Sequence, residues 1–260
     1  MGDDIMLTAK LARLQQEYPH MNIVPAGGLK KLDVSAAYSN NPIFDHDPAK
    51  DTMYYEVKPR PYIKYFGENS SGTYTAFNDQ HLVPGHIYLT DDEIERAKQV
   101  APAADFIYIE PNYKKPGIYS DNKQWSAKKW QSVVDAFPDS NFVQCGNGKS
   151  DDSVVLDNVT MIYTKRVREA FAVLSLASMF IGYEGGMHHA AAALGKGGVV
   201  LFGGVSSPSA TGYDLHINVY GEHPESPCGR HYECSHCKEV MKSLTADQVI
   251  REVKELIQSE

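Results

Sequence analysis

The chain has 260 residues, 42% of them hydrophobic and 22% charged, which is typical of one large α/β domain or two compact ones. Its formal net charge of −8 argues against a nucleic-acid partner, because duplex binding usually needs a basic face. No segment approaches the ~20 apolar residues of a membrane helix, and the first residues carry no basic region of the kind that opens a secretory leader.

The first half of the chain predicts one clear helix and less regular structure after it. Apolar residues at helical spacing predict an amphipathic helix over 4–17, and a short strand is expected over 22–24. Residues 40–85 are rich in Tyr, Pro, Asn, Asp and Gly and predict loops and short strands. Thr90-Asp91-Asp92-Glu93 is a capping box that opens a helix through residue 100, and a strand is expected over 105–109.

In the second half of the chain, the expected helices and strands alternate more regularly. Residues 111–121 hold two prolines and Gly117 and predict a linker. We therefore expect two α/β domains, over 1–113 and 114–260, that face each other across a cleft where a ligand binds. After the linker the pattern predicts helices over 126–136, 166–176 and 246–259 and strands over 141–144 and 159–163.

Residues 181–195 form the most informative stretch of the chain. An apolar run over 177–181 leads into Glu184-Gly185-Gly186, and an alanine-rich segment with high helix propensity follows. The next apolar strand, over 198–202, ends in Gly203-Gly204. This order predicts one βαβ step of a nucleotide-binding sheet. Its glycine junction would present unpaired N–H groups and a positive helix end to phosphate oxygens.

These residues resemble glycosyltransferase family 9, the heptosyltransferase group. The resemblance implies an α/β fold with two Rossmann-like domains facing a cleft (the GT-B architecture), the first domain being reduced. The family's Asp-(Ser/Thr)-Gly-x-x-His pattern resembles residues 184–189, and the strand that ends in Phe-Gly resembles residues 201–203. Further matches are the Pro/Thr-rich loop over 207–212, Lys123-Gln124-Trp125, and Gly2-Asp3 at the start of the first helix.

The resemblance implies transfer of a heptose-like sugar, with inversion, from a nucleotide-diphosphate sugar. No cofactor or divalent metal would be required for catalysis. A lipopolysaccharide-type glycan is the implied acceptor, and a protein acceptor stays open. Two alternatives remain: a catalytically weakened partner protein that still binds a nucleotide sugar, and a sugar-nucleotide epimerase or hydrolase on the same fold.

Each implied site residue also has a purely structural interpretation. Asp3 would be the catalytic base with Asp4 as its competitor, although both acids also suit a helix N-terminus. Glycines at such a junction often serve only a tight turn, and a histidine on an alanine-rich helix is often a core residue. The implied donor site comprises Lys123, Glu184, Gly185, Gly186, Met187, His188, His189, Thr211 and Gly212.

Two departures from the family pattern affect these expectations. The family places a strand ahead of Gly-Asp, whereas this chain begins at Met1-Gly2, so we expect the first strand to be absent or supplied otherwise. An open sheet edge of that kind would invite self-pairing into a homo-oligomer. In addition, Glu184 stands where the family has Asp, one methylene shorter.

The cysteines predict a separate structural site. Cys228, Cys234 and Cys237 have a spacing near that of zinc or iron ligands, and Cys145, His231 or His236 is the candidate for a fourth ligand. Some relatives that modify proteins carry a four-cysteine iron site in this region, which the cluster resembles. The alternatives are free thiols or a disulfide formed on oxidation. Such crowding does not suit a secreted disulfide framework, so a cytoplasmic protein is expected.

Overall fold

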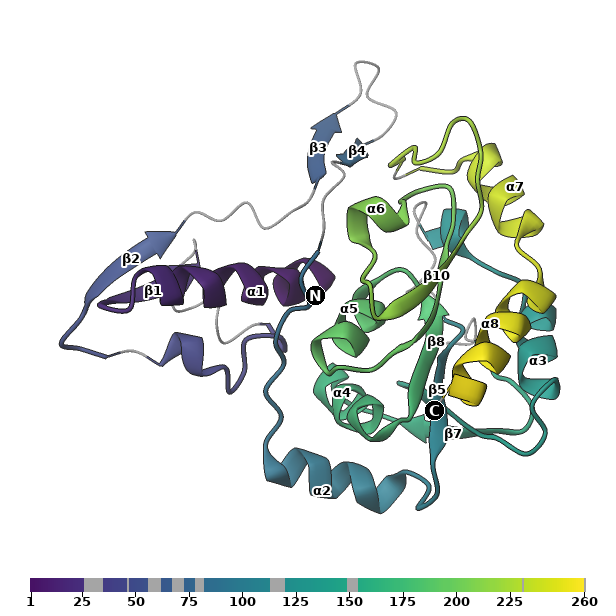
Figure 1. The fold of residues 1–260 in the computed structure, drawn as a ribbon, viewed down its shortest axis with the longest axis horizontal. Helices are drawn as coiled ribbons and strands as arrows, with labels where there is room; N and C mark the ends of the chain where they lie inside the picture. Colours follow the sequence, from purple (N-terminus) through teal and green to yellow (C-terminus); the bar gives the residue numbers. More distant parts are fainter. Residues whose placement is uncertain are drawn as a thin grey trace.

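A six-stranded sheet with helices on both faces forms the centre of the molecule, and a smaller first part lies beside one of those faces (Figure 1). None of the described helices has the length and apolarity that crossing a membrane demands. The computed structural model describes residues 1–25, 35–45, 47–55, 62–66, 73–77, 82–112, 120–148, 154–230 and 232–259.

All six strands of the central sheet run parallel, in the order β10-β9-β8-β5-β6-β7. The central strands β8 and β9 are buried along their whole length, because helices cover both faces and leave no side for polar residues. The strands are β5 (Phe106–Glu110), β6 (Asn141–Gly146), β7 (Val159–Tyr163), β8 (Met179–Tyr183), β9 (Gly198–Phe202) and β10 (His216–Tyr220).

Helices α4 and α5 cover the face of this sheet that is turned toward the first part, and α3 and α8 cover the opposite face (Figure 1). Each helix buries an apolar side, and α2 packs along α4. The helices of this part are α2 (Asp91–Val100), η3 (Ser120–Lys123), α3 (Ala127–Asp135), α4 (Val167–Leu176), α5 (Gly186–Ala193), α6 (Pro208–Thr211), α7 (Ser235–Ser243) and α8 (Ala246–Ser259).

The strand order reverses between β5 and β8. The chain leaves β5 toward α3 on one face and leaves β8 toward α5 on the other, so the two connections diverge. In open α/β sheets a divergence of this kind makes a crevice at the carboxyl ends of the two strands, and ligands bind there. At this switch point β5 ends at Glu110, and β8 is followed by the Glu184-Gly185-Gly186 junction.

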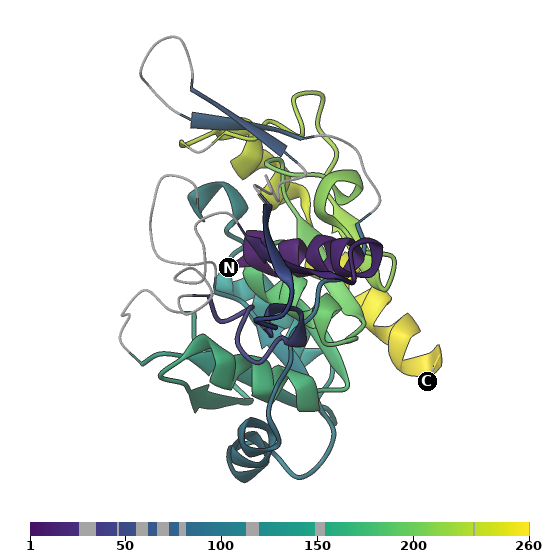
Figure 2. The same ribbon diagram turned by 90° about the vertical axis from the view of Figure 1, so that its left-hand side faces the viewer.

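The first part contains α1 (Gly2–Glu17), which crosses in front of the second part's helices (Figure 2). Its strands β1 (Met21–Pro25) and β2 (Asp51–Tyr55) pair in parallel, with the short helix η2 (Pro42–Phe44) between them. Strands β3 (Tyr62–Phe66) and β4 (Thr73–Phe77) pair with each other in antiparallel fashion. Among the described residues, this part thus has two sheets of two strands each, against the six-stranded sheet of the second part.

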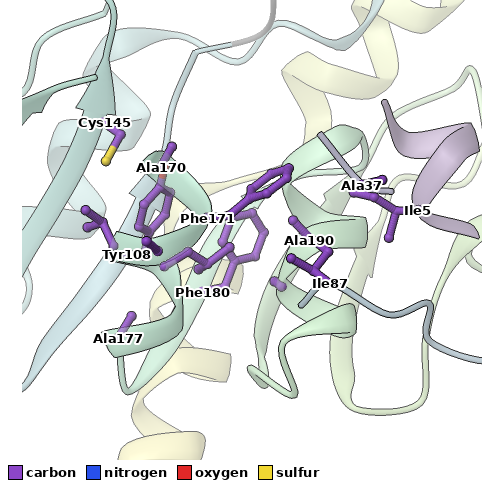
Figure 3. Close-up of a cluster of buried hydrophobic side chains, with 14 of the residues drawn as sticks. Ile5, Ala37, Ile87, Tyr108, Cys145, Ala170, Phe171, Ala177, Phe180 and Ala190 are labelled. Carbon is purple, nitrogen blue, oxygen red and sulfur yellow. The ribbon is translucent and has the colours of Figure 1, made fainter. Parts of the chain in front are cut away.

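One hydrophobic core joins the two parts. Ile5 and Ala37 from the first part are fully buried, and they belong to the same cluster as Phe171 on α4 and Ala190 on α5 (Figure 3). Ile87, from the segment that leads toward α2, packs into the same cluster. The orientation of α1 toward α5 is therefore fixed by packing.

Arg168 on α4 adds a polar clamp to this contact. Its Nε and one terminal nitrogen donate to the two carboxylate oxygens of Glu93, each at 2.6 Å. The hydrogen bonds of Arg168 to Glu93 lower the pKa of that carboxyl group although its partial burial opposes this. The guanidinium also donates to the carbonyl oxygens of Ala36, Ser39 and Tyr88 at 2.8, 3.4 and 2.7 Å.

The structure has the expected strands and helices of the second half, and the Thr90–Glu93 capping box is present. The predicted boundary between residues 113 and 114, in contrast, does not follow the sheet. Strand β5 was assigned to the first domain, yet it pairs with both β6 and β8 at the centre of the second. Pro111 follows β5 directly, and residues 113–119, which hold the rest of the expected linker, lie outside the described residues.

Candidate active site

Glu184 lies directly after β8, at the carboxyl edge of the sheet, and forms an ion pair with Lys123 at the end of η3. Both side chains are buried, with 10% and 6% of their surfaces exposed. Burial alone would raise the pKa of Glu184, but the charge of Lys123, with help from His189 and a hydrogen bond from Thr211, holds it below the ordinary value. The site therefore contains a fixed carboxylate and a fixed ammonium group.

Aromatic residues hold Lys123 in place. The fully buried Trp125 donates its backbone N–H to the hydroxyl group of Tyr183 at 2.7 Å and its indole N–H to the carbonyl oxygen of Leu244 at 2.9 Å. Trp130 on α3 donates its indole N–H to the same hydroxyl at 2.8 Å. The Lys-x-Trp segment is thereby anchored to β8, one residue before Glu184.

The N-terminus of α5 lies next to this ion pair. The first amides of an α-helix have no acceptor within the helix, so Gly186 and Met187 present N–H groups at this end. The N–H of Gly185 is already used, since it donates to Nδ1 of His188 at 3.4 Å. Of the three predicted phosphate-binding amides, Gly185 thus serves the turn itself.

The N-terminus of α1 meets that of α5. A Cβ atom on Gly2 would lie 2.7 Å from Cδ2 of His189, and one on Gly186 would lie 2.5 Å from the methyl carbon of Met1. The ring of His189 leaves no room for a Cβ atom at Gly2, so glycine at that position lets the two helix ends approach closely. Two positive helix ends therefore converge beside Lys123, an arrangement that attracts a doubly charged anion.

The two acids at the start of α1 have different surroundings. The carboxylate of Asp4 accepts hydrogen bonds from Ser35 and from Tyr38, both at 3.0 Å. Asp3 lies near enough to His189 for its charge to raise the pKa of that imidazole. Asp4 is thus bound within the first part, whereas Asp3 is at the junction of the two helix ends.

The predicted histidines are both buried. Burial lowers the pKa of His189 to about 4 although the charges of Glu184 and Asp3 oppose this, so its imidazole is neutral at pH 7. Burial also lowers the pKa of His188, whose ring lies within aromatic contact distance of Tyr213 and His216. His188 is therefore a core residue beneath the glycine turn, and His189 is the one at the helix junction.

The hydroxyl group of Thr211 and the backbone N–H of Gly212 both make hydrogen bonds within the protein. The hydroxyl group of Thr211 hydrogen-bonds Glu184 and lies 2.8 Å from that of Ser206, so it supports the ion pair from beneath. The N–H of Gly212 donates to the carbonyl oxygen of Pro208 at 2.8 Å, and a Cβ atom there would lie 2.6 Å from the same oxygen. Gly212 therefore closes α6 with an amide that is already occupied.

Three of the four cysteines come together with a histidine. The ligand atoms of Cys228, Cys234, His236 and Cys237 all lie within 4.8 Å of one another. The Cys228 and Cys237 sulfur atoms are 3.3 Å apart, and Nε2 of His236 is 3.5 Å from the latter. Hydrogen bonds from Cys237 and from the Arg230 amide lower the pKa of Cys228. Three thiols and one imidazole fit a closed tetrahedral metal site.

The expectation of Cys145 as a metal ligand is wrong. Cys145 lies on β6 and packs in the core with Tyr108 and Phe171, whereas the cluster packs around Val205. His236 is the fourth ligand-type side chain of the cluster, because the first turn of α7 places it beside Cys237. His231, the other candidate, lies outside the described residues.

Asn122 connects the cysteine cluster to the ion pair. Its side-chain oxygen accepts the backbone N–H of Cys234 at 2.9 Å, and its amide group donates to the carbonyl oxygen of Tyr232 at 2.7 Å. Because Lys123 is the next residue, the loop that bears Cys234 is held against the segment that bears Lys123. The position of the loop that bears Cys234 is therefore coupled to the position of Lys123.

A family model for glycosyltransferase family 9 (heptosyltransferase) matches residues 78–246, more than half of the chain. The chain belongs to glycosyltransferase family 9. The match includes the central sheet, Lys123, the glycine junction and Thr211, whereas α1 and Asp3 lie ahead of it.

Solved structures of the family share the fold. ADP-heptose LPS heptosyltransferase II of E. coli is 16% identical, with a TM-score of 0.51, over 69% of this chain and 55% of its own. A family 9 glycosyltransferase from Veillonella parvula DSM 2008 is 16% identical, with a TM-score of 0.53, over 71% and 57%. The iron-containing dodecameric glycosyltransferase TibC of enterotoxigenic E. coli H10407 is 17% identical, with a TM-score of 0.52, over 69% and 50%.

The chain thus spans little more than half the length of these family members. No curated protein sequence matches it. The likeness establishes the α/β architecture of the family, with a parallel sheet and its switch point. What the chain binds and transfers is a matter for proposal.

Sequence reasoning missed two residues at the site. Tyr213, in the turn between α6 and β10, lies 2.8 Å from Nδ1 of His189. Glu110 ends the central strand β5 at the switch point, where burial raises its carboxyl pKa to about 8. A charged residue that ends a buried apolar strand, followed by Pro111, was the available signal for Glu110. Nothing local marks Tyr213, because its contact crosses 24 residues.

Proposed function

We propose that this chain transfers a heptose-like sugar from a nucleotide-diphosphate sugar to a glycan or protein acceptor, with inversion at the sugar carbon. The observation that carries the proposal is the convergence of the α1 and α5 N-termini beside the buried Lys123–Glu184 pair. Such a concentration of N–H dipoles and positive charge suits a departing diphosphate. Membership of family 9 supports the same reaction class.

In the proposed reaction Asp3 accepts the proton of the acceptor hydroxyl. The acceptor oxygen then forms its bond to the sugar carbon as the bond from that carbon to the diphosphate oxygen breaks. The electron pair leaves with the diphosphate, which the Gly186 and Met187 amides and Lys123 stabilise. Asp4 is the weaker candidate for the base because its carboxylate is directed toward Ser35 and Tyr38 of the first part.

Asp3→Asn is expected to lower kcat for release of ADP from an ADP-sugar by about 100-fold or more, since the amide cannot accept the proton. The affinity for ADP should change by less than about threefold, because no diphosphate contact is lost. Rates from a coupled ADP assay and affinities from calorimetry provide the test. Asp4→Asn is the matched control and should retain most of the rate.

The results separate the alternatives. A wild-type protein that binds ADP-sugars without turnover would be the catalytically weakened binding partner. A protein that binds neither ADP nor UDP contradicts the proposal altogether. Equal loss of rate in the Asp3 and Asp4 variants would remove Asp3 from the role of base.

We further propose that Cys228, Cys234, Cys237 and His236 hold a structural zinc or iron ion that stabilises the loop next to Lys123. Elemental analysis of purified protein is expected to find about one such ion per chain. Cys234→Ser should lose it and lower Tm, whereas Cys145→Ser should retain it because that thiol lies in the core. Metal-free wild-type protein would contradict this site.

We also propose a location, an assembly state and two acceptor classes for this chain. Four free cysteines suit a reducing compartment, which supports a cytoplasmic location. The family 9 neighbour TibC is dodecameric, which makes a homo-oligomer a reasonable expectation for this chain. The choice between a lipopolysaccharide-type glycan and a protein acceptor needs acceptor assays on both.

A further inference from the structure

Tyr213 makes a buried contact with His189 that the proposed reaction does not by itself require. The tyrosine is 2% exposed, and its hydroxyl oxygen lies 2.8 Å from Nδ1 of His189. The two rings meet edge to face, with their centroids 5.6 Å apart. Both side chains are therefore held in a single relative orientation.

The proton of this hydrogen bond can be assigned. Burial, and then the charge of Glu184, raise the pKa of the Tyr213 phenol, so it stays protonated at neutral pH. A buried hydroxyl group has to donate its hydrogen to an acceptor or lose a hydrogen bond that water would supply. In the part of the chain that the structure describes, Nδ1 of His189 is the acceptor within reach.

The donation from Tyr213 determines which nitrogen of His189 carries hydrogen. A neutral imidazole has one N–H group and one bare nitrogen. Since Nδ1 accepts, Nε2 bears the hydrogen. The ring edge with Nε2 faces the start of α1, where a Cβ atom on Gly2 would lie 3.4 Å from Nε2. The N–H group thus lies at the junction of the two helix ends.

We infer that Tyr213 is a positioning residue that fixes His189 in its Nε2–H tautomer, so that His189 donates a hydrogen bond to the diphosphate and does not act as a base. The role toward diphosphate rests on the proposed function, whereas the tautomer does not. An N–H donor at this point adds to the amides of α5 without adding charge. It leaves Asp3 as the proton acceptor at the junction.

The tautomer is observable in the free protein. In nitrogen-15 NMR of histidine-labelled protein at pH 7, His189 is expected to show a bare Nδ1 and a protonated Nε2. Tyr213→Phe removes the donor and should give a mixture of the two tautomers. Tyr183→Phe is the matched control: it also removes a buried hydroxyl, one that accepts from Trp125 and Trp130, and should leave the His189 signals unchanged. A protonated Nδ1 in the wild type overturns the inference.

Binding of pyrophosphate and ADP tests the donor role. Gln places its amide nitrogen near the position of Nε2, whereas Asn places it near Nδ1. His189→Gln is therefore expected to bind both ligands within about threefold of wild type, and His189→Asn about tenfold more weakly, the loss of one hydrogen bond to a charged group. Equal losses in the two variants overturn the donor role. A wild type that binds neither ligand refutes the proposed function, and the NMR result still decides the tautomer.

Discussion

Lys123→Met is expected to lower the free energy of unfolding by about 3 kcal/mol at pH 7, because it leaves the buried Glu184 carboxylate without its partner. It should also weaken ADP binding by at least tenfold, since a charge-assisted contact to phosphate is lost. Urea denaturation and calorimetry measure the two effects. Met retains most of the length of the lysine side chain, so the loss reports charge and not an empty space.

The pH dependence of this variant tests the ion pair directly. In the wild type the pKa of Glu184 is held low, so its contribution to stability is present above the unfolded pKa and is lost as the pH falls through the folded value. Without Lys123, burial should raise the folded pKa instead. Lys123→Met should then be less destabilised at pH 5 than at pH 8.

The double variant Lys123→Met with Glu184→Gln is the control for this pair. It removes both charges and should recover much of the stability while ADP binding stays weak. Stability losses that simply add in the double variant would show that the two side chains are not energetically coupled. An unchanged affinity for ADP in Lys123→Met would remove Lys123 from the donor site.

Arg168→Ala is expected to destabilise the protein by about 3 kcal/mol, because it removes a bidentate ion pair and three contacts to carbonyl oxygens. Glu93 is left partly buried without its cation, which increases the loss. Chemical denaturation monitored by tryptophan fluorescence provides the measurement. Arg168→Lys should recover only part of the loss, since an ammonium group cannot reproduce the two-pronged contact.

Arg166→Ala is the matched control for Arg168. Arg166 lies two residues away and is exposed, and its side chain makes no cap hydrogen bond to α4. Its replacement should change the unfolding free energy by less than about 0.5 kcal/mol. Similar losses in both alanine variants would mean that the clamp contributes no more than an exposed arginine does.

Local patterns were enough to predict five of the six strands of the central sheet, and β10 was not expected. Buried parallel strands read as short apolar runs, and this is why β8 and β9 were found on either side of the glycine junction. The Thr90–Glu93 capping box located the start of α2 because both of its hydrogen bonds are local. The candidate donor-site residues Lys123 and Glu184 were found through the family resemblance, and their direct pairing was not foreseen.

Long-range contacts account for what the sequence did not predict. Cys145 was chosen as a ligand by residue type, but its place on β6 turns it into the core. Helix α7 was missed because the crowded cysteines and histidines of its first turn obscured its apolar spacing. The prolines after β5 suggested a linker, and the pairing of β5 with β6 and β8 across that segment could not be foreseen from local sequence.

The core that unites Ile5 with Phe171 and Ala190 sets a limit on how the two lobes can move. Swinging them apart would expose this apolar surface to water, at a cost that rises with every side chain uncovered. In the proposed reaction, the distance between Asp3 and the N-terminus of α5 is therefore set by this packing. Substitutions that weaken this packing would therefore displace the proposed base and the proposed diphosphate site together.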